Sequence, residues 1–431
     1  PKMISNEWTG TMNLTEPQAG SDVGALRTKA VPNGDGTYAI SGQKIYITWG
    51  DHDLTPNICH LVLARLPDAA PGTKGISLFM VPKYLPGEDG TPGAFNNVRT
   101  VSIEEKLGIH GSPTAVLEYE ASTGWLVGPE NGGMKAMFTM MNNARLGVGG
   151  QGVGAAEGAY RHALAFANER KQGKSPFDTI IGHADVRRML ATMKAEIFAA
   201  RAIALDCAIS IDMGRATGEA EWDARAAFLT PIAKAFGTDI GCEVSEMGVQ
   251  VHGGMGYVEE SGAAQFYRDV RVTAIYEGTN GIQAMDLVGR KLSLKGGQLV
   301  RTLFGVLSTY LKDNADAPYR EELKGAMKAL ETATLWLATH APKDPEQAGA
   351  AATPYLRLMA LTVIGYLWSR MAGVAAQQLE ADGGNRPLLE GKQVSARFYF
   401  EKLLPEVHWL LADIESGKEA MMAFGDDHWA A

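Results

Sequence analysis

Cysteine is scarce in this chain of 431 residues. Its three cysteines, Cys59, Cys207 and Cys242, lie far apart and form no CxxC pair. Neither a disulfide framework nor a cysteine-based zinc site is therefore indicated, and a reducing compartment is the natural expectation. The nine histidines show no HExxH motif or other metal-ligand spacing, so the sequence predicts no protein-bound metal ion.

The chain also lacks a positive excess of charge and a long uninterrupted hydrophobic run. Its net charge of -9 argues against a sequence-independent hold on nucleic acid or on an anionic membrane. The longest apolar stretch, residues 355–368, contains Arg357 and is shorter than the roughly 20 residues that span a bilayer, so we expect a buried helix there. No signal peptide opens the chain, which starts "PKMISNEWTG" as though inside a domain, and we expect an upstream segment to be missing.

What is present is the composition of a globular protein, with 45% hydrophobic and 21% charged residues. The length predicts two or three domains. Residues 1–125 are rich in β-branched residues, in short runs such as "TYAISGQKIYIT", "HLVLARL" and "TAVLEYE" that are separated by turn sequences such as "PNGDG". This spacing predicts an all-β barrel or sandwich.

From about residue 130 onward the sequence pattern changes to that of long helical segments. Residues 130–292 predict a four-helix bundle with helices over roughly 131–171, 182–216, 221–252 and 280–292. After the glycine-containing joint "KLSLKGGQ", residues 298–431 predict an additional helical domain whose methionines and aromatics are core residues. The expected fold class is therefore α+β and multidomain, and no catalytic constellation is evident after about residue 292.

One carboxylate, Glu277, lies in the segment "AIYEGTNGIQ", between an aromatic ring and a Gly-Thr-Asn-Gly turn. An acid before a glycine and ahead of an apolar-periodic segment is typical of a helix start. A catalytic acid is the alternative interpretation, and the segment alone does not decide between the two.

Four further segments combine hydroxyl, glycine or basic residues, and each has a structural and a functional interpretation. "NLTEPQAGSD" (13–22) and "YITWG" (46–50) suit either ordinary turns and strand ends or hydrogen bonds to a ligand. "VQVHGGMGY" (249–257) suits either a helix C-cap at Gly253 or a close approach of backbone to a ligand. "ANERKQGK" (167–174) suits either a basic helix end or a phosphate clamp.

Taken in order, these motifs resemble the acyl-CoA dehydrogenase family throughout residues 8–292. They are "TEPQAGSD", "YIT", "ARLGVGGQGVGAAEGAYRHALAFANERKQGK", "QVHGGMGY" and "RDVRVTAIYEGTNGIQ". The added helical region resembles the longer branch of the family that includes 3-methylmercaptopropionyl-CoA dehydrogenases. The resemblance implies an N-terminal helical domain, which we expect to be missing from the sequence given, then a middle β domain and a four-helix bundle, with FAD bound between the last two and across a subunit interface.

The resemblance implies that Glu277 is the base that removes an α-proton from an acyl-CoA thioester while a hydride leaves the β-carbon for the flavin. The product would be a trans-2-enoyl-CoA. The backbone N–H of Glu277 would help to stabilise the enolate oxygen. Burial beside Tyr276 would strengthen the carboxylate as a base.

The resemblance also implies contacts with cofactor and substrate. Substrate contacts are implied for Ser21, Asn142, Arg145 and Gly278, and Asn142 stands where the family often has aspartate. Cofactor contacts are implied for two sets, of which the second includes contacts with the FAD of a neighbouring subunit: Leu14, Thr15, Ser21 and Thr48, and then Arg170, Gln250, Gly253, Gly254 and Thr279.

The expected partners are an acyl-CoA substrate, an electron-transferring flavoprotein as acceptor, and further copies of the chain in a homodimer or homotetramer. We expect no nucleic acid or membrane partner, and a bacterial cytoplasmic rather than a mitochondrial location. Two alternative functions remain: an acyl-CoA oxidase with the same base and flavin, and a non-dehydrogenating, DNA-binding flavoprotein homologue. The acidic charge balance argues against the second alternative.

Overall fold

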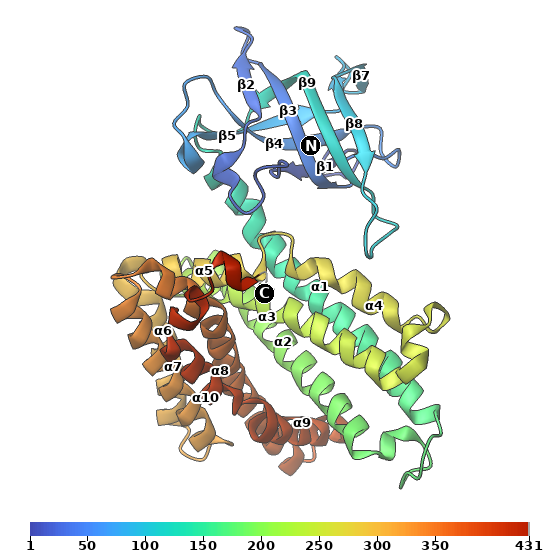
Figure 1. Ribbon diagram of the computed structural model, residues 1–431, viewed down its shortest axis with the longest axis vertical. Helices are drawn as coiled ribbons and strands as arrows, with labels where there is room; N and C mark the ends of the chain where they lie inside the picture. The colour runs from blue at the N-terminus through green and yellow to red at the C-terminus, as the bar shows by residue number, and fades with distance from the viewer. Residues whose placement is uncertain (430–431) are drawn as a thin grey trace. The chain divides into compact units, whose positions relative to one another are not determined.

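The computed structural model describes residues 1–429, apart from the side chain of Lys295 (Figure 1). Two compact units can be distinguished by their internal contacts, one spanning Pro1–Asn143 and the other beginning at Ala144. The first unit is built of β-strands and the second of helices. The expected α+β fold class is therefore confirmed.

The first unit is a barrel. Its strands pair in the closed order β4-β2-β3-β9-β5-β4, while β1 extends the sheet from β4 and β8 extends it from β9. Of the two architectures that the sequence left open, barrel and sandwich, the chain adopts the first. The strands are β1 (Thr9–Asn13), β2 (Lys29–Pro32), β3 (Tyr38–Thr48), β4 (Ile58–Arg65), β5 (Ile76–Pro82), β8 (Val98–Ile103) and β9 (Thr114–Leu126), with a separate hairpin of β6 (Tyr84–Pro86) and β7 (Pro92–Phe95).

Apolar side chains fill the barrel. Ile40, Val62, Phe79 and Leu117 come from four different strands, and each is almost completely buried. Tyr119 is also buried there, and its hydroxyl donates to the side chain of Asn13 on β1 at 3.1 Å. A buried phenol needs such an acceptor, and this bond ties the end of β1 to β9.

The helical unit begins within α1 (Gly133–Glu169), the helix that follows the barrel. Three long helices, α1, α2 (Ala184–Thr217) and α3 (Ala220–His252), lie close to the ranges predicted from the sequence. The remaining helices are α4 (Ala263–Val270), α5 (Asn280–Asp286), α6 (Gln298–Asp313), α7 (Arg320–His340), α8 (Pro345–Glu380), α9 (Arg386–Phe398), α10 (Glu406–Ser416), α11 (Glu419–Met422) and α12 (Asp426–Trp429), with π-helical turns over Leu287–Lys291 and Tyr399–Leu403.

The helices before and after residue 298 pack into one continuous hydrophobic core. Ile197 of α2 and Phe236 of α3 belong to the same buried cluster as Leu358 and Trp368 of α8. Figure 1 shows the later helices, in orange and red, beside the green helices of the bundle. The added helical region is therefore attached to the bundle through a shared apolar interior.

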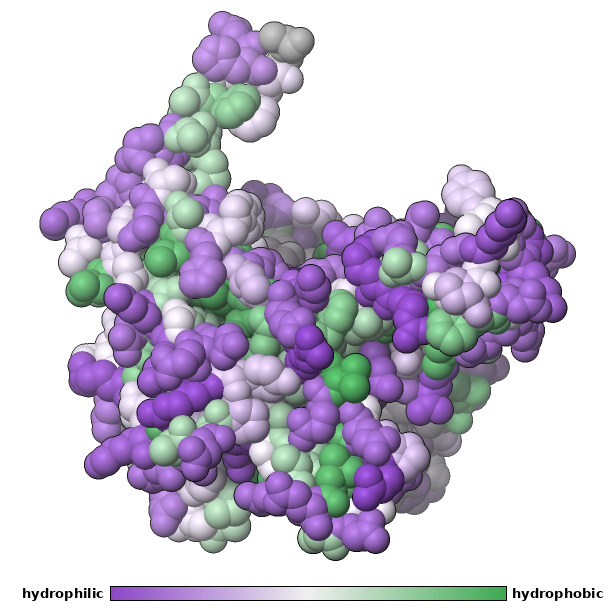
Figure 2. Space-filling view, turned by 90° about the horizontal axis from the view of Figure 1, so that it is seen from below, coloured by the Kyte–Doolittle hydropathy of each residue, from purple (hydrophilic) through white to green (hydrophobic). Residues whose placement is uncertain are grey.

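Helix α8 contains the longest apolar stretch of the sequence and is long and apolar enough to cross a membrane. However, 78% of its most hydropathic window is buried inside the protein, which is the behaviour of a core helix. On the face shown in Figure 2, polar residues predominate and hydrophobic ones are scattered among them. The prediction of a buried helix at 355–368 is confirmed.

Helices α1 and α3 approach each other so closely that only glycine fits between them. A Cβ atom on Gly152 of α1 would lie 2.1 Å from the carbonyl oxygen of Gly237 on α3, and one on Gly149 would lie 2.6 Å from that of Ala233. Such distances are far below van der Waals contact. This close approach brings side chains from both helices to the segment that contains Glu277.

Candidate active site

Glu277 lies in a sharp turn between a 3₁₀ turn (Arg271–Ala274) and α5. Its φ of 56° is in the left-handed region, and Gly278 follows with φ of 84°. A left-handed conformation is uncommon for a residue with a side chain, and such strained residues cluster at functional sites. The turn is therefore a local exception that its surroundings must maintain.

The helix-start interpretation of Glu277 is not what the structure shows. The N-cap of α5 is Thr279, whose hydroxyl accepts a hydrogen bond from the N–H of Ile282 at 3.2 Å. Glu277 precedes this cap by two residues. Its carboxylate makes no hydrogen bond or ion pair with any residue of the described chain.

The electrostatic setting of the Glu277 carboxylate favours its protonated form. Burial raises the pKa of Glu277 above the usual range, and the positive charges of Arg145 and Lys234 oppose this rise only in part. A carboxylate that is partly removed from water and not hydrogen-bonded is a stronger base than one in solution.

The backbone carbonyls of the turn are held from two helices. Arg145 of α1, almost completely buried, donates from its Nε to the carbonyl oxygen of Glu277 at 3.4 Å, and its Nη1 lies 3.9 Å from the carboxylate of Asp286. Gln283 of α5 donates its amide N–H to the carbonyl oxygens of Glu277 and Gly278, at 3.3 and 3.2 Å. The sequence-predicted residues Arg145 and Gly278 are thus brought together with Glu277.

Lys234 of α3, which the sequence analysis missed, supplies a third support. It is fully buried, and its ammonium donates to the carbonyl oxygen of Gly278 at 2.9 Å and to the side chain of Asn280 at 2.8 Å. Asn280 in turn donates to the carboxylate of Asp239 at 2.6 Å. A signal was available, because this lysine stands inside the apolar run "LTPIAKAFG" (229–237), where a charged residue needs a buried partner.

The N–H groups of the turn contrast with its carbonyls. Those of Glu277 and Gly278 have no hydrogen-bond acceptor within residues 1–429. Beside them, the hydroxyl of the half-buried Tyr276 donates to the side chain of Gln151 on α1. The turn therefore offers free donors next to an unpartnered carboxylate.

In the barrel unit, the loop after β1 carries the predicted residues Leu14, Thr15 and Ser21. Its anchor is Glu16, whose carboxylate forms a buried ion pair with Lys44 at 2.9 Å. The same ammonium donates to the carbonyl oxygen of Leu14 at 2.9 Å. The sequence reasoning did not single out either member of this pair.

Three hydroxyls of the barrel unit remain available to a ligand. Those of Thr15, Ser21 and Thr48 make no hydrogen bond to any part of the chain that the structure describes. Thr48 is exposed at the very end of β3. Thr48 therefore ends the strand, as the structural interpretation expected, but its hydroxyl caps no backbone group of the described residues.

Arg170, Gln250, Gly253 and Gly254 gather at the end of the bundle where α1 and α3 finish. His252 of α3 stacks on Phe166 of α1 with ring centroids 4.5 Å apart. Arg170 follows Phe166 by one helical turn, and it is exposed, like Gln250 and the two glycines. Gly253, with φ of 60°, is the C-cap of α3, so the capping interpretation is right for its backbone.

Asn142 is exposed on α1, within the barrel unit. Ser21 also belongs to the barrel unit, whereas Glu277 belongs to the helical unit. Among the described residues, no group of three or more His, Cys, Asp or Glu side chains could hold a metal ion.

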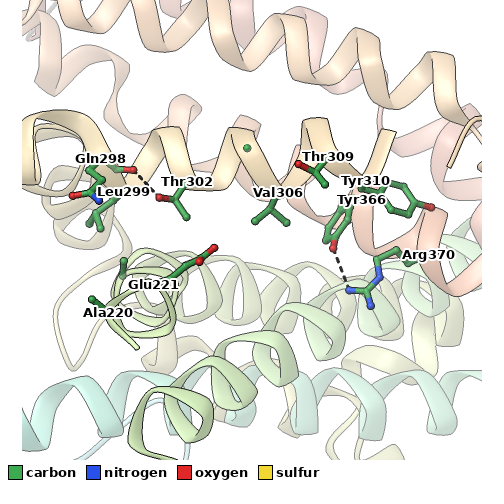
Figure 3. Close-up of a pocket in the computed structure, with 12 residues that line it drawn as sticks. Ala220, Glu221, Gln298, Leu299, Thr302, Val306, Thr309, Tyr310, Tyr366 and Arg370 are labelled. Atoms are coloured by element: carbon green, nitrogen blue, oxygen red, sulfur yellow. Dashed lines mark hydrogen bonds between the residues drawn. The ribbon is translucent and has the colours of Figure 1, made fainter. Parts of the chain in front are cut away.

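A separate cavity of about 750 Å³ lies between α3, α6 and α8. Figure 3 shows Glu221 at one side and Arg370 at the other, where Arg370 donates to the hydroxyl of Tyr366 at 3.2 Å. None of the sequence-predicted site residues lines this cavity, so its size gives no reason to move the candidate site away from Glu277.

Three family models match this chain. Residues 11–122 match the acyl-CoA dehydrogenase middle domain, residues 131–292 match the acyl-CoA dehydrogenase C-terminal domain, and residues 303–425 match an acetyl-CoA dehydrogenase C-terminal-like domain. Together they cover most of the chain.

Individual relatives agree with these matches. The chain is 46% identical over 420 residues to 3-methylmercaptopropionyl-CoA dehydrogenase of Ruegeria pomeroyi, covering 94% of this chain and 71% of that protein. An acyl-CoA dehydrogenase from Bacillus anthracis, solved with FAD, has a TM-score of 0.76 at 22% identity. The alignment covers 97% of this chain and 70% of the Bacillus anthracis chain. For Caenorhabditis elegans ACDH-11, solved with C11-CoA, the TM-score is 0.77 at 22% identity.

The alignment with ACDH-11 covers 92% of this chain but only 65% of that one, so the chain spans about two thirds of the length of such relatives. These two solved structures share the fold. The family models and the 46% identical relative decide the identity: the chain belongs to the acyl-CoA dehydrogenase family of flavoprotein oxidoreductases.

Proposed function

We propose that this protein is an FAD-dependent acyl-CoA dehydrogenase that converts an acyl-CoA thioester to a trans-2-enoyl-CoA, with Glu277 as the base. The observation that carries the proposal is the carboxylate of Glu277, which is partly buried and unpartnered on a left-handed turn whose carbonyls at Glu277 and Gly278 are both held. A purely structural acid would be paired or exposed to water.

Glu277 would take the α-proton of the thioester onto its carboxylate. The α-proton is a weak acid, so the base needs the raised pKa that burial gives to Glu277. Arg145 and Lys234 both act from the carbonyl side of the turn, and both keep this pKa from rising further.

The free N–H groups of Glu277 and Gly278 would stabilise the negative charge that develops on the thioester oxygen. Preorganised donors of this kind contribute strongly because they need no reorganisation when the charge appears. The direction of the Gly278 N–H is set by the peptide plane that it shares with the held carbonyl of Glu277. One short segment would therefore supply both the base and the oxyanion donors.

The residues of the chain suit FAD, which when bound would accept the hydride from the β-carbon. The barrel unit offers the hydroxyls of Thr15, Ser21 and Thr48, on a loop and a strand end fixed by the Glu16–Lys44 pair. Hydroxyl and backbone donors of this type orient a flavin ring and tune its electronics.

The diphosphate contacts belong to a second set, formed by Arg170, Gln250, Gly253 and Gly254. The guanidinium is exposed, and a Cβ on either glycine would meet nothing within 4 Å, so a ligand can approach the backbone there. Arg145 and Arg170 are 25 residues apart on one helical path, or about 37 Å at 1.5 Å per residue. A single FAD that reaches Glu277 cannot also reach Arg170 of the same chain, which supports a homo-oligomer that shares its cofactors between subunits.

The relatives support an acyl-CoA thioester as the substrate class. A 3-methylmercaptopropionyl thioester is the first substrate to test, because the relative with 46% identity is named for it. We propose an electron-transferring flavoprotein as the acceptor of the electrons. An oxidase would instead pass them to oxygen and form hydrogen peroxide, so turnover with and without oxygen separates the two.

The proposal is tested by mixing the FAD-loaded protein anaerobically with acyl-CoA thioesters of different chain types and following the loss of flavin absorbance. In Glu277→Gln, bound flavin should retain its spectrum but bleach about 10²-fold more slowly, as expected for loss of a general base. Glu260→Gln, which changes an exposed glutamate of the same unit, should bleach at the normal rate. Normal bleaching in Glu277→Gln would overturn the assignment.

A further inference from the structure

Lys234 is a fully buried lysine that the proposed chemistry does not use directly. Desolvation of an ammonium is costly unless acceptors surround it. Here the acceptors are the carbonyl oxygen of Gly278 and the side-chain oxygen of Asn280. Both acceptors lie within three residues after Glu277. The ammonium of Lys234 therefore makes its hydrogen bonds to the turn and to the first residue of α5.

We propose that Lys234, together with Asn280, is a positioning residue that holds the left-handed turn at Glu277 in its catalytic geometry. The inference deepens the proposed function, since it rests on Glu277 being the base. Lys234 does not touch the reacting atoms and acts only through the turn.

The physical basis is the planarity of the peptide bond. A fixed carbonyl oxygen also fixes the direction of the next N–H, because both lie in one plane and point in opposite directions. Arg145 and Gln283 fix the carbonyl of Glu277, and Lys234 with Gln283 fixes that of Gly278. The N–H groups of Gly278 and Thr279 are thereby aimed as well.

Asn280 extends this support into the body of α3. Its side-chain oxygen accepts from Lys234 at 2.8 Å and from Thr238 at 3.2 Å, while its amide donates to Asp239 at 2.6 Å. Three successive polar positions of one helix thus converge on the first residue of α5. Removal of any one leaves a buried polar group without its partner, which is the costly case.

The charge of Lys234 adds a pH signature. Glu277 faces the positive charges of Arg145 on α1 and Lys234 on α3, and burial raises the pKa of Glu277 while both charges oppose the rise. Lys234 itself faces Asp239, Arg145, Glu277 and Cys242, and burial lowers its pKa to about 8. Loss of Lys234 therefore raises the pKa of Glu277, and the acidic limb of the rate against pH should move to higher pH.

The test compares Lys234→Met with Lys291→Met in the full chain. Lys291 is a matched control: it is also a buried lysine of the helical unit, it also donates to a backbone carbonyl, that of Ala227, and burial also lowers its pKa to about 8. Methionine retains the volume of each side chain and removes the charge.

Two readouts are measured on each variant. Single-turnover flavin bleaching across pH should show kcat reduced by about 10²-fold in Lys234→Met, the effect of displacing a reacting group by about 1 Å, with KM little changed and the acidic limb at higher pH. Amide hydrogen exchange over residues 282–286, the first hydrogen-bonded amides after the turn, should accelerate in Lys234→Met, and both readouts should stay at the wild-type values in Lys291→Met.

A second variant, Asn280→Ser, retains the lysine charge but loses the contact with Asp239. It should lower kcat and accelerate exchange at the turn while leaving the acidic limb in place. Equal behaviour of Lys234→Met and Lys291→Met would overturn the inference, as would an unchanged turn in Asn280→Ser. If wild-type protein were never bleached by any acyl-CoA, the proposed function would fall, and the exchange data alone would still decide whether Lys234 holds the turn.

Discussion

The buried ion pair of Glu16 and Lys44 gives the most quantitative prediction, because both its charges lie out of contact with water. The carboxylate of Glu16 also accepts hydrogen bonds from the backbone and hydroxyl of Thr28 and from the backbone of Arg27. Replacing Glu16 by Gln removes the negative charge while retaining the shape. The lysine would then be buried beside the carbonyl of Leu14 without a counter-charge.

The magnitude follows from the two pKa values. Burial raises the pKa of Glu16, but the charge of Lys44 and the bonds from Thr28 and Arg27 lower it from 4.5 to about 2, which at 1.36 kcal/mol per pH unit corresponds to about 3 kcal/mol of stability. Burial lowers the pKa of Lys44 from 10.5 to about 8, an opposing cost of about the same size. The intact pair is thus close to neutral, whereas breaking it should destabilise the barrel by about 3–5 kcal/mol.

Urea unfolding of wild type, Glu16→Gln, Lys44→Met and the double variant measures this. Each single variant should lose about 3–5 kcal/mol, and the double variant should recover most of that loss, so the coupling energy should reach or exceed about 3 kcal/mol, the upper end of the usual range. Between pH 4.5 and about 2 the unfolded state binds more protons at Glu16 than the folded state, so the stability of the wild type should fall as the pH falls through this window. The stability of Glu16→Gln should lack this contribution to the pH dependence. Additive losses in the double variant would refute the reasoning.

Two other predictions concern the helical unit. Gly152→Ala should destabilise it by about 1–3 kcal/mol, because the new Cβ would lie 2.1 Å from the carbonyl oxygen of Gly237. Gly150→Ala on the same helix, where a Cβ meets nothing within 4 Å, should be neutral or stabilise by up to about 1 kcal/mol. The denaturant midpoints of the two variants test this difference. Burial, with the nearby charge of Glu243, raises the pKa of Glu196 to about 8. The folded state therefore binds a proton at Glu196 more tightly than the unfolded state, and it loses stability as the pH rises from 4.5 to 8. Glu196→Gln should remove that loss in melting curves at about pH 6 and 8, and a pH dependence identical to that of the wild type would contradict the prediction.

Much of the fold could be predicted from the sequence because its signals are local. The alternating run "TYAISGQKIYIT" is β3 apart from its first residue, "HLVLARL" lies in β4 apart from its last residue, and the periodic segment 182–216 is α2 within two residues at each end. Alternation and 3.6-residue periodicity are properties of neighbouring residues. Closure of the barrel between β4 and β5 is not, since it depends on pairing across the chain.

The same distinction applies to the site. Glu277 stands out because an acid beside an aromatic residue and a glycine-rich turn is visible within ten residues. Lys234 and Arg145 support the turn from positions 44 and 132 residues away in the sequence, and no local pattern records that convergence. The Glu16–Lys44 pair, 28 residues apart, escaped for the same reason.

Two glutamates in short, similar-looking segments, "TEP" and "YEG", have opposite environments. Glu16 is surrounded by donors and a buried ammonium, which lower its pKa to about 2, so it stays charged and holds a loop in place. Glu277 has no partner for its carboxylate, and burial raises its pKa. Two acids whose pKa values are shifted in opposite directions can take different roles. The donors around Glu16 occupy the lone pairs of its carboxylate. Around Glu277, by contrast, Arg145, Lys234 and Gln283 all donate to backbone carbonyls of the turn. The turn is thereby fixed while its one side-chain base is left free to accept a proton.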